Sequence, residues 1–441
     1  MSAIRILAIT MVIASAAPLA QTGGTRWTTP TRAEVDAIYP DIEALYLDLH
    51  RNPELAFQET RTAATLAARV KALGFEVTTG VGKTGVVAVM RNGAGPTVML
   101  RTELDALPVE EKTGLPFASV VVTKNAAGQL VPVMHACGHD LHMAAWAGAA
   151  RVMAEHRDRW RGTLVMVGQP AEEGTAGASA MLNDGLFTRF PRPDFALSLH
   201  DDDTMPAGTI GYHPGYFRAM SDAVTITVYG RGGHAAMPHN TVDPVVLAAR
   251  IVLSLQTVVA RENNPVDPVV VTIGSIHGGT QGNIIPDEVR LQLSVRTYTP
   301  AVRTRTLAAI RRIAKGEAIA AGAPREPQVD APAVAGAPVY NDPALTLRLA
   351  DALKRGLGEA EVVEMPQKMT SEDFAQYGLA GVPSVLLHIG AVDPAKLAAA
   401  RDTGIPVPAP HSPEWAPERE PTLKAAVRAE VTALLELFRA Q

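Results

Sequence analysis

The chain alternates between long amphipathic stretches and short, mostly apolar runs, and this alternation predicts its elements. Apolar positions recur every three to four residues in the stretches that we predict to be helices: 32–51, 60–73, 140–155, 176–186, 342–356 and 420–440. Short apolar runs predict strands at 75–79, 85–90, 97–103, 163–168, 195–200, 361–365 and 384–389. The Asn92-Gly93 pair predicts a hairpin turn between the second and third of these strands.

Strands and helices follow one another in turn between residues 97 and 200. Strand–helix–strand units of this kind build parallel sheets that helices cover. We therefore predict an α/β fold with a mixed, largely parallel sheet.

A different pattern fills the middle of the chain. A strand with alternating polar and apolar positions is followed by a long helix, two strands and a second helix, at 221–230, 243–262, 268–276, 288–297 and 301–321. This β-α-β-β-α order is typical of a ferredoxin-like unit with an antiparallel sheet. We predict that residues 219–330 form a domain inserted between two parts of the larger one, 23–218 and 331–441. The Pro-rich stretch 323–338 is predicted to be the return crossing.

The first 22 residues have the pattern of an export signal. Arg5 precedes a mostly apolar run, 6–20, and small residues occur at 14–17 and at Ala20. A basic, an apolar and a small-residue region in this order are typical of a secretory signal peptide, and the alternative is a buried N-terminal helix. We expect residues 1–22 to be removed and the protein to be periplasmic or secreted.

Composition and charge exclude several classes of function. The 441 residues carry a net charge of −5, so the chain offers no basic field for nucleic acid. A single cysteine, Cys137, excludes an internal disulfide and zinc or redox motifs of the CxxC type. Beyond the signal segment, no apolar run reaches the roughly 18 residues that predict a membrane span. We expect neither nucleic acid nor a membrane as a partner of the mature protein.

Ionisable residues follow the predicted strands where those strands end. Asp105 follows the strand 97–103, and Glu172-Glu173 follow the strand 163–168. His200 ends the strand 195–200, and the loop from Cys137 to Asp140 opens a helix. The carboxyl ends of parallel strands form the sites of open α/β sheets. Thiolate, imidazole and carboxylate groups together suit zinc and similar divalent ions, and a neighbouring glutamate suits a general base.

Four segments resemble signatures of the M20 metallopeptidase family, and they match its amidohydrolase branch best. They are Leu100-Arg101-Thr102-Glu103-Leu104-Asp105, Met134-His135-Ala136-Cys137-Gly138-His139-Asp140, Gln169-Pro170-Ala171-Glu172-Glu173-Gly174 and Ser371-Glu372-Asp373-Phe374. That branch includes hippurate hydrolases, N-acyl-amino-acid deacylases and auxin-conjugate hydrolases. The resemblance implies a catalytic domain of zinc-peptidase type and cleavage of the amide bond of N-acyl amino acids or short peptides.

The resemblance also implies roles for individual residues. The ligands of two divalent ions (Zn, Mn, Co or Ni) would be Cys137, His139, Glu173, His200 and His411, with Cys137 as the bridge. Glu172 would be the general base, and Asp105 would orient the site. The inserted domain would form a homodimer in which His234 reaches the partner's active site. Asn283 and Arg296 would hold the substrate carboxylate.

The sequence departs from the branch pattern near the expected pocket. Glu103 stands where Asp is usual, Asp201–Asp203 follow His200, and His388 lies in a strand that is usually aromatic. The acidic run would either favour a cationic group on the substrate or form a solvated loop. His142 would either orient the site or pack within its helix, and we expect His50 to be structural.

Two other functions remain open at this point. Cys137 could be a nucleophile that His139 activates, although no oxyanion loop is evident. The chain could also be a non-catalytic binding dimer that kept the fold. Glu172 and all the expected ligands are present, which favours the metal-dependent hydrolase.

Overall fold

The computed structural model describes residues 29–332 and 336–439, so the predicted signal peptide lies outside the described residues. The larger unit is built on an eight-stranded sheet in the order β1-β2-β6-β3-β7-β18-β8-β17. Its strands are β1 (Glu76–Val81), β2 (Gly85–Asn92), β3 (Thr97–Glu103), β6 (Gly162–Gln169), β7 (Phe195–Pro206), β8 (Ile210–Tyr212), β17 (Val362–Glu364) and β18 (Ser384–Val392). The central strands β6, β3, β7 and β18 are parallel, and antiparallel pairs flank them. The predicted mixed, largely parallel sheet is confirmed.

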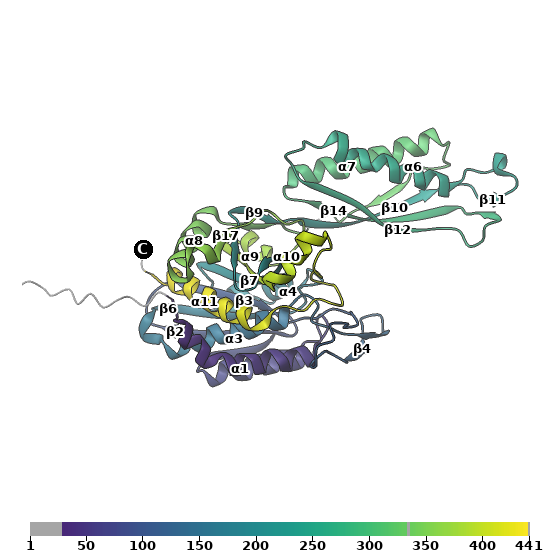
Figure 1. Ribbon diagram of the computed structural model, residues 1–441. Coiled ribbons are helices and arrows are strands. Elements are labelled where there is room, and N and C mark those ends of the chain that lie inside the picture. Colours follow the sequence, from purple (N-terminus) through teal and green to yellow (C-terminus); the bar gives the residue numbers. More distant parts are fainter. Residues whose placement is uncertain (1–28, 333–335, 440–441) are drawn as a thin grey trace, which may run out of the picture.

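Helices cover both faces of this sheet (Figure 1). Neighbouring residues of a central strand point to opposite faces, so Leu100 belongs to one core and Met99 to the other. The helices on the Leu100 side are α1 (Arg32–Arg51), α2 (Thr60–Ala72), α3 (His139–Glu155), α8 (Pro343–Leu357) and α11 (Arg419–Leu437). Those on the Met99 side are the shorter α4 (Gly177–Asn183), α5 (Leu186–Arg189) and α9 (Ala375–Leu379).

The first helix begins where the sequence predicts, because Thr31 caps it. The Thr31 hydroxyl accepts a hydrogen bond from the Glu34 amide (3.2 Å), and the Glu34 carboxylate accepts one from the Thr31 amide (2.6 Å). This reciprocal capping box satisfies backbone donors that the first turn of a helix leaves free.

The predicted hairpin between β2 and β3 is wrong. Strand β6 lies between them, antiparallel to β2 and parallel to β3. The Asn92-Gly93 turn is present, with Gly93 at φ 84°. The chain then runs past the start of β6, where the Pro96 carbonyl accepts a hydrogen bond from the Thr163 amide (2.9 Å). A turn residue fixes a local reversal, whereas strand pairing is decided by a segment far along the chain.

Two other expectations need correction. The predicted helix 176–186 is the two short helices α4 and α5, because Gly185 between them adopts φ 89°. Several strands were not predicted because they are too short to show a period. They are β4 (Val122–Lys124), β5 (Leu130–Pro132), β8, β9 (Gly215–Arg218) and β16 (Val339–Asn341). Helix α10 (Pro394–Thr403) was not predicted because it buries no residue and so has no apolar face to recognise.

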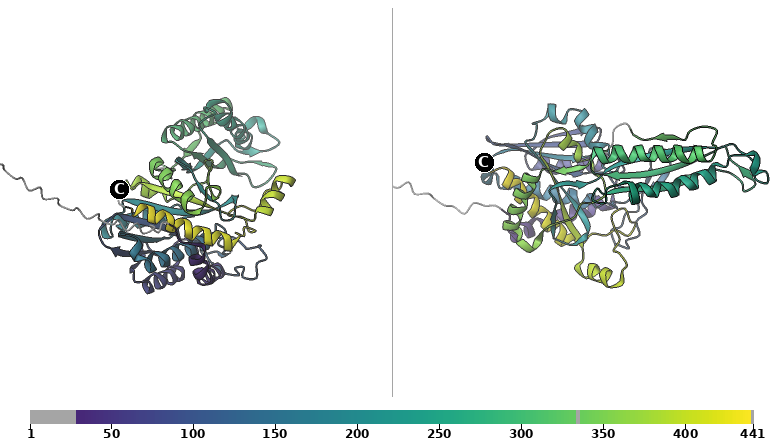
Figure 2. Two further views of the ribbon diagram at one scale, coloured as in Figure 1. Left: turned by 60° about the vertical axis from the view of Figure 1, so that its left-hand side comes forward. Right: turned by 90° about the horizontal axis from the view of Figure 1, so that it is seen from above.

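Residues 220–330, here called the smaller unit, project from the larger unit (Figures 1 and 2). Its antiparallel sheet has the order β12 (Val269–His277), β14 (Glu288–Thr297), β10 (Met220–Tyr229) and β15 (Gln328–Asp330). Helices α6 (Pro244–Thr257) and α7 (Pro300–Ala320) pack against the sheet around a core of its own. Strand β15 lies within the stretch predicted as a crossing, so it adds a fourth strand to the expected β-α-β-β-α order.

Within the described residues, one helix, Pro244–Glu262, is long and apolar enough to cross a membrane. It comprises α6 and the helical turn that follows. Leu247 and Leu255 are buried in the core of the smaller unit, so this helix packs as a core helix there. On its other side Val246 and Leu253 are exposed.

Candidate active site

Three strands bring the predicted site residues to one edge of the large sheet. Strands β6, β3 and β7 are adjacent and parallel, so their carboxyl ends meet. Asp105 follows β3, Glu172 and Glu173 follow β6, and His200 lies within β7. The side chains that the sequence assigned to three separate strand ends therefore converge.

The loop that carries Cys137 is held by a backbone conformation that only glycine adopts easily. Gly138 has φ 70°, and helix α3 begins at the next residue, His139. A Cβ atom at Gly138 would lie 2.3 Å from Asp201 Oδ2. The close approach brings the Cys137 Sγ to 3.6 Å from His200 Nε2.

The predicted metal ligands form two overlapping groups. One contains Cys137, His139 and His200, and the other contains Cys137, Glu173 and His411. Within each group the possible ligand atoms lie within 4.8 Å of one another. Cys137 belongs to both groups, so two ions held there would share it.

Unpartnered buried atoms at this place fit a bound cation. His139 Nδ1 lies 2.8 Å from the Asp105 backbone carbonyl, which makes Nδ1 the donor and leaves Nε2 with a free lone pair. In the part of the chain that the structure describes, His139 Nε2 and Glu173 Oε1 are buried without a hydrogen-bond partner. Buried polar atoms are rarely left unpaired. Sulfur, nitrogen and oxygen donors together suit zinc or a similar divalent ion.

Asp105 organises the loop that carries both glutamates. Its Oδ1 accepts a hydrogen bond from the Glu172 amide and its Oδ2 one from the Glu173 amide, each at 3.0 Å. Ala171 and Thr175, on either side of the pair, both have φ 50°, a region that non-glycine residues seldom occupy. Strained backbone of this kind persists where surrounding contacts fix it, and here Asp105 does so.

Glu172 is buried beside the ligand groups. Its Oε2 lies 3.9 Å from His139 Nε2. Burial, reinforced by the negative charges of Glu372 and Glu173, raises the pKa of the Glu172 carboxyl well above its usual range. A carboxyl with a raised pKa can take up a proton and later release it, and nearby cations oppose the shift.

A buried ion-pair network around Arg101 lies next to the site. The sequence alone assigned its members no role. The Arg101 guanidinium pairs with Glu103, with Glu372 (2.8 Å) and with Asp373 (3.0 Å). Arg101 is fully buried, so each of these carboxylates compensates a charge removed from water. The signal was present in the sequence: Arg101 and Glu103 follow the apolar run Val98-Met99-Leu100 within one predicted strand, and buried charges need partners.

His142, whose role the sequence left open, and His50, which we expected to be structural, both connect segments of the site. His142 Nδ1 lies 3.0 Å from Glu103 Oε2, and its Nε2 accepts a hydrogen bond from the Asp201 amide (2.8 Å). His142 therefore orients the segment that carries His200. His50 lies between the carboxylates of Asp140 (2.7 Å) and Glu111 (3.1 Å), directly behind the Cys137 loop.

The acidic run is neither a solvated loop nor a free anionic surface. Residues 201–203 continue strand β7, and basic side chains meet them. Asp202 accepts a hydrogen bond from His388 Nδ1 (2.7 Å) and pairs with Lys368. His388 Nε2 in turn accepts from Arg218. Burial and the charge of Arg218 lower the pKa of His388 to about 3, so the ring is neutral.

A cavity of about 420 Å³ opens onto the ligand groups. Besides Cys137 and Glu172, its lining includes three basic residues, Arg218, Arg296 and Lys368. A volume of this size matches a small-molecule substrate. Of the two predicted carboxylate-binding residues, Arg296 therefore lies at the site.

His234 and Asn283 lie elsewhere in the same chain. His234 belongs to β11 (Gly233–His234), and Asn283 directly precedes its partner strand β13 (Ile284–Ile285) at the far end of the smaller unit (Figure 1). There Ala235 N donates to the Asn283 carbonyl (3.1 Å). The length of β14 separates this end from Arg296, a distance on the order of 30 Å at about 3.3 Å per residue. One chain alone does not bring these residues to its own ligand groups.

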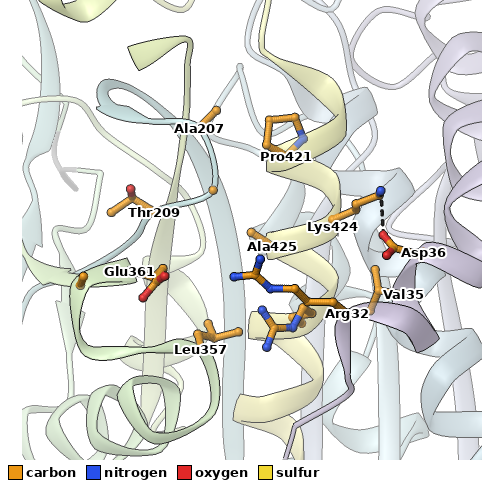
Figure 3. A pocket seen from close by; sticks show the side chains of 13 residues that line it. Arg32, Val35, Asp36, Ala207, Thr209, Leu357, Glu361, Pro421, Lys424 and Ala425 are labelled. Atoms are coloured by element: carbon orange, nitrogen blue, oxygen red, sulfur yellow. Dashed lines mark ion pairs between the residues drawn. The ribbon is translucent and has the colours of Figure 1, made fainter. Parts of the chain in front are cut away.

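A second cavity, of about 490 Å³, is lined by α1, α11, the turn after β7 and the segment at the end of α8 (Figure 3). It contains an ion pair between Lys424 and Asp36 (2.7 Å). None of the predicted site residues lines it. The predicted site residues therefore line the first cavity and not the second.

Comparison with known proteins agrees with this site. The sequence pattern of peptidase family M20/M25/M40 matches residues 99–407, which include the Cys137, Glu172 and His200 segments. This chain belongs to that family. The M20 protein is 36% identical over 343 residues to an N-acetyl-L-cysteine deacetylase from Bacillus subtilis, across 78% of each chain. It is 36% identical over 347 residues to a hippurate hydrolase from Campylobacter jejuni, across 77% of this chain and 86% of the relative.

Solved structures of M20 proteins share the architecture. A dinuclear metal-binding peptidase of the M20 family from Bacillus subtilis superposes with a TM-score of 0.72 at 28% identity. The match covers 92% of this M20 chain and all of the other. The α/β fold that the sequence predicts is thus that of the family.

Proposed function

We propose that the protein is a metal-dependent amidohydrolase that cleaves the amide bond of N-acyl amino acids or short peptides. The observation that carries this proposal is the meeting of Cys137, His139, Glu173, His200 and His411 beside the buried carboxyl of Glu172. The names of the relatives, a deacetylase and a hippurate hydrolase, support the same reaction and substrate class.

The chain's own residues divide the work. Cys137, His139, Glu173, His200 and His411 would hold two divalent ions, with Cys137 shared. Such ions polarise a carbonyl and lower the pKa of water. Glu172 accepts a proton from the attacking water and delivers it to the nitrogen of the leaving amine. The products are a carboxylic acid and a free amino acid.

The two alternatives have less support. Cys137 belongs to both ligand groups, so bound metal would occupy the thiolate that a nucleophile needs. A non-catalytic binding protein has no need of Glu172 in its buried position, and Glu172 is intact.

We also propose a homodimer formed through the smaller unit. Strand β12 is an edge strand of its sheet. Helix α6 exposes Val246 and Leu253 on the side that faces away from the core of the smaller unit. Unpaired edges and exposed apolar side chains are typical of a surface that a partner covers. In such a dimer His234 of the partner subunit would reach the cavity to stabilise the oxyanion, and Asn283 would join Arg296 on the substrate carboxylate.

We propose, finally, that the protein is exported. The basic, apolar and small-residue regions of residues 1–22 support a mature protein outside the cytoplasm. Burial of Cys137 among metal-type ligands would protect this thiol from oxidation there.

The test is amino-acid release from N-acetyl, N-benzoyl and dipeptide substrates by the mature protein. Chelator-stripped protein should be inactive, and Mn²⁺ or Zn²⁺ should restore turnover. Glu172→Gln should bind metal but lose activity by at least about 10²-fold, because its amide accepts no proton. Metal content is measured alongside the rate.

The other outcomes have clear meanings. Turnover that survives complete metal removal and stops on thiol alkylation would establish Cys137 as a nucleophile. Metal binding without turnover of any substrate would favour the binding protein.

A further inference from the structure

Two arginines from different elements line the active-site cavity beside the ligand groups. Arg218 ends β9, and Arg296 lies near the end of β14. The segment 368–371 contacts both. Arg218 and Lys368 form a β-bridge, and Arg296 Nη1 donates a hydrogen bond to Ser371 Oγ (3.1 Å). The larger and smaller units therefore each contribute one guanidinium to the same cavity.

The hydrogen bonds of Arg218 go to a neutral acceptor, and among the described residues its one ion pair is a long one, to Glu372. Its side chain is 6% exposed, and its Nε and Nη2 donate to His388 Nε2 at 3.3 and 3.1 Å. His388 presents that lone pair because its Nδ1 donates to Asp202. Over residues 29–332 and 336–439, Nη1 makes no hydrogen bond, and its nearest acidic atom is Glu372 Oε2 at 3.9 Å. Nη1 is thus available to a ligand.

Arg296 is without an acidic partner among the described residues. Its Nε donates to Ser294 Oγ and its Nη1 to Ser371 Oγ, both at 3.1 Å and both to neutral hydroxyls. The acidic groups nearby pair elsewhere, since Lys368 meets both Asp202 and Asp203. The wall thus holds two guanidinium groups that no carboxylate of the described residues hydrogen-bonds, and the ion pair of Arg218 with Glu372 spans 3.9 Å.

A buried guanidinium N–H group that makes no hydrogen bond is costly unless a ligand supplies an acceptor. The α-carboxylate of an N-acyl amino acid can satisfy one such group, in keeping with the role proposed for Arg296. Arg218 Nη1 then lacks a hydrogen-bond acceptor in any complex with a singly charged substrate.

We propose that Arg218 and Arg296 form a subsite for two anionic groups, so that the preferred substrates carry a second carboxylate besides the α-carboxylate. This inference rests on the proposed amidohydrolase function. The second carboxylate belongs either to the side chain of the amino acid or to the acyl group, and both place the same chemistry against Arg218.

Matched substrate pairs test the inference, because each pair differs in charge at nearly constant size. N-acetyl-L-glutamate is compared with N-acetyl-L-glutamine for the side chain. N-succinyl-L-alanine is compared with its monoamide for the acyl group. In at least one pair, kcat/KM of metal-loaded enzyme should be at least about tenfold higher for the acidic member, as expected for a charge-assisted hydrogen bond.

Variants connect that preference to Arg218. Arg218→Gln should reduce the acidic-to-neutral ratio of kcat/KM to near one, and Arg218→Lys should retain part of it because the charge remains. The ratio is internal to each preparation, so partial unfolding cancels. Arg91→Gln, which removes an exposed arginine paired with Glu76, is the matched control and should keep the wild-type ratio.

The possible failures are distinct. Hydrolysis without preference for either acidic member, or an unchanged ratio in Arg218→Gln, would overturn the inference and leave the amidohydrolase standing. No hydrolysis of any N-acyl amino acid, with metal bound, would overturn both.

Discussion

At the scale of single residues, the side chains around the ligand groups hold those ligands in place. Asp105 fixes the amides of Glu172 and Glu173, while its backbone carbonyl fixes the ring of His139. His50 holds two carboxylates behind the Cys137 loop. Such contacts set the orientation of each ligand before a metal arrives.

Asp105→Asn should reduce kcat/KM and metal affinity by about 10- to 100-fold, because its amide nitrogen would face one of two N–H donors. The measurement combines kinetics with metal competition against a chelator. Asp184→Asn is the matched control, since Asp184 also accepts a backbone N–H, from Gly82 (3.0 Å), away from the site. Equal losses in both variants would contradict an orienting role for Asp105.

His50 predicts a pH dependence of stability. Burial disfavours its charged ring, but the hydrogen bonds and charges of Asp140 and Glu111 outweigh burial and raise the pKa of His50 to about 10. The folded-state pKa exceeds the unfolded value of about 6.5. The stabilisation is therefore fully present below about pH 6.5 and is lost as pH rises through about 10.

Urea unfolding of wild type and His50→Gln measures this effect. The difference in unfolding free energy should shrink by on the order of 2–4 kcal/mol between pH 6.5 and 10. Parallel curves for the two proteins would show that His50 is not charged in the folded state.

At the scale of elements, the site depends on where helices and strands begin and end. Helix α3 starts at His139 only because Gly138 turns the chain, and β7 extends past His200 so that Asp201 meets that turn. The Glu172 loop joins β6 to α4. Small backbone changes at these junctions should thus move several ligands together.

Gly138→Ala should destabilise the protein by about 1–2 kcal/mol through its left-handed backbone alone, and more through the contact with Asp201. It should also lose metal, because Cys137 and His139 shift. Gly316→Ala is the control: Gly316 lies inside α7 with no atom within 4 Å of an added Cβ. That change should stabilise by about 0.5–1 kcal/mol. Thermal unfolding and metal content give both results, and retained metal in Gly138→Ala would contradict the argument.

At the scale of the whole molecule, the smaller unit holds His234 and Asn283 away from the cavity of their own chain. Arg296, at the other end of the same unit, lines that cavity. In a homodimer, the end of the smaller unit that carries His234 and Asn283 would reach the cavity of the partner subunit, so each site would be completed by residues of the other chain.

Mixing two inactive variants tests this exchange. Glu172→Gln and His234→Ala should each be nearly inactive as homodimers. Co-expressed in equal amounts, half of the dimers are mixed and each has one intact site, so about a quarter of wild-type activity should return. His239→Ala, an exposed histidine near His234, should remain active on its own. No recovery on mixing would mean that His234 does not act across the dimer.

The sequence by itself determined the α/β class, the order of the main elements and the identity of the ligand candidates. Those features depend on local periodicity and on chemically unusual residues at strand ends, such as Asp105 and His200. The pairing of β2 with β6, the pairing of Asp202 with Lys368 and His388, and the cavity that joins Arg218 to Arg296 were decided only by the tertiary structure. Each of these contacts joins segments far apart in the chain, and local pattern carries no information about which distant partner satisfies a buried charge or a free strand edge.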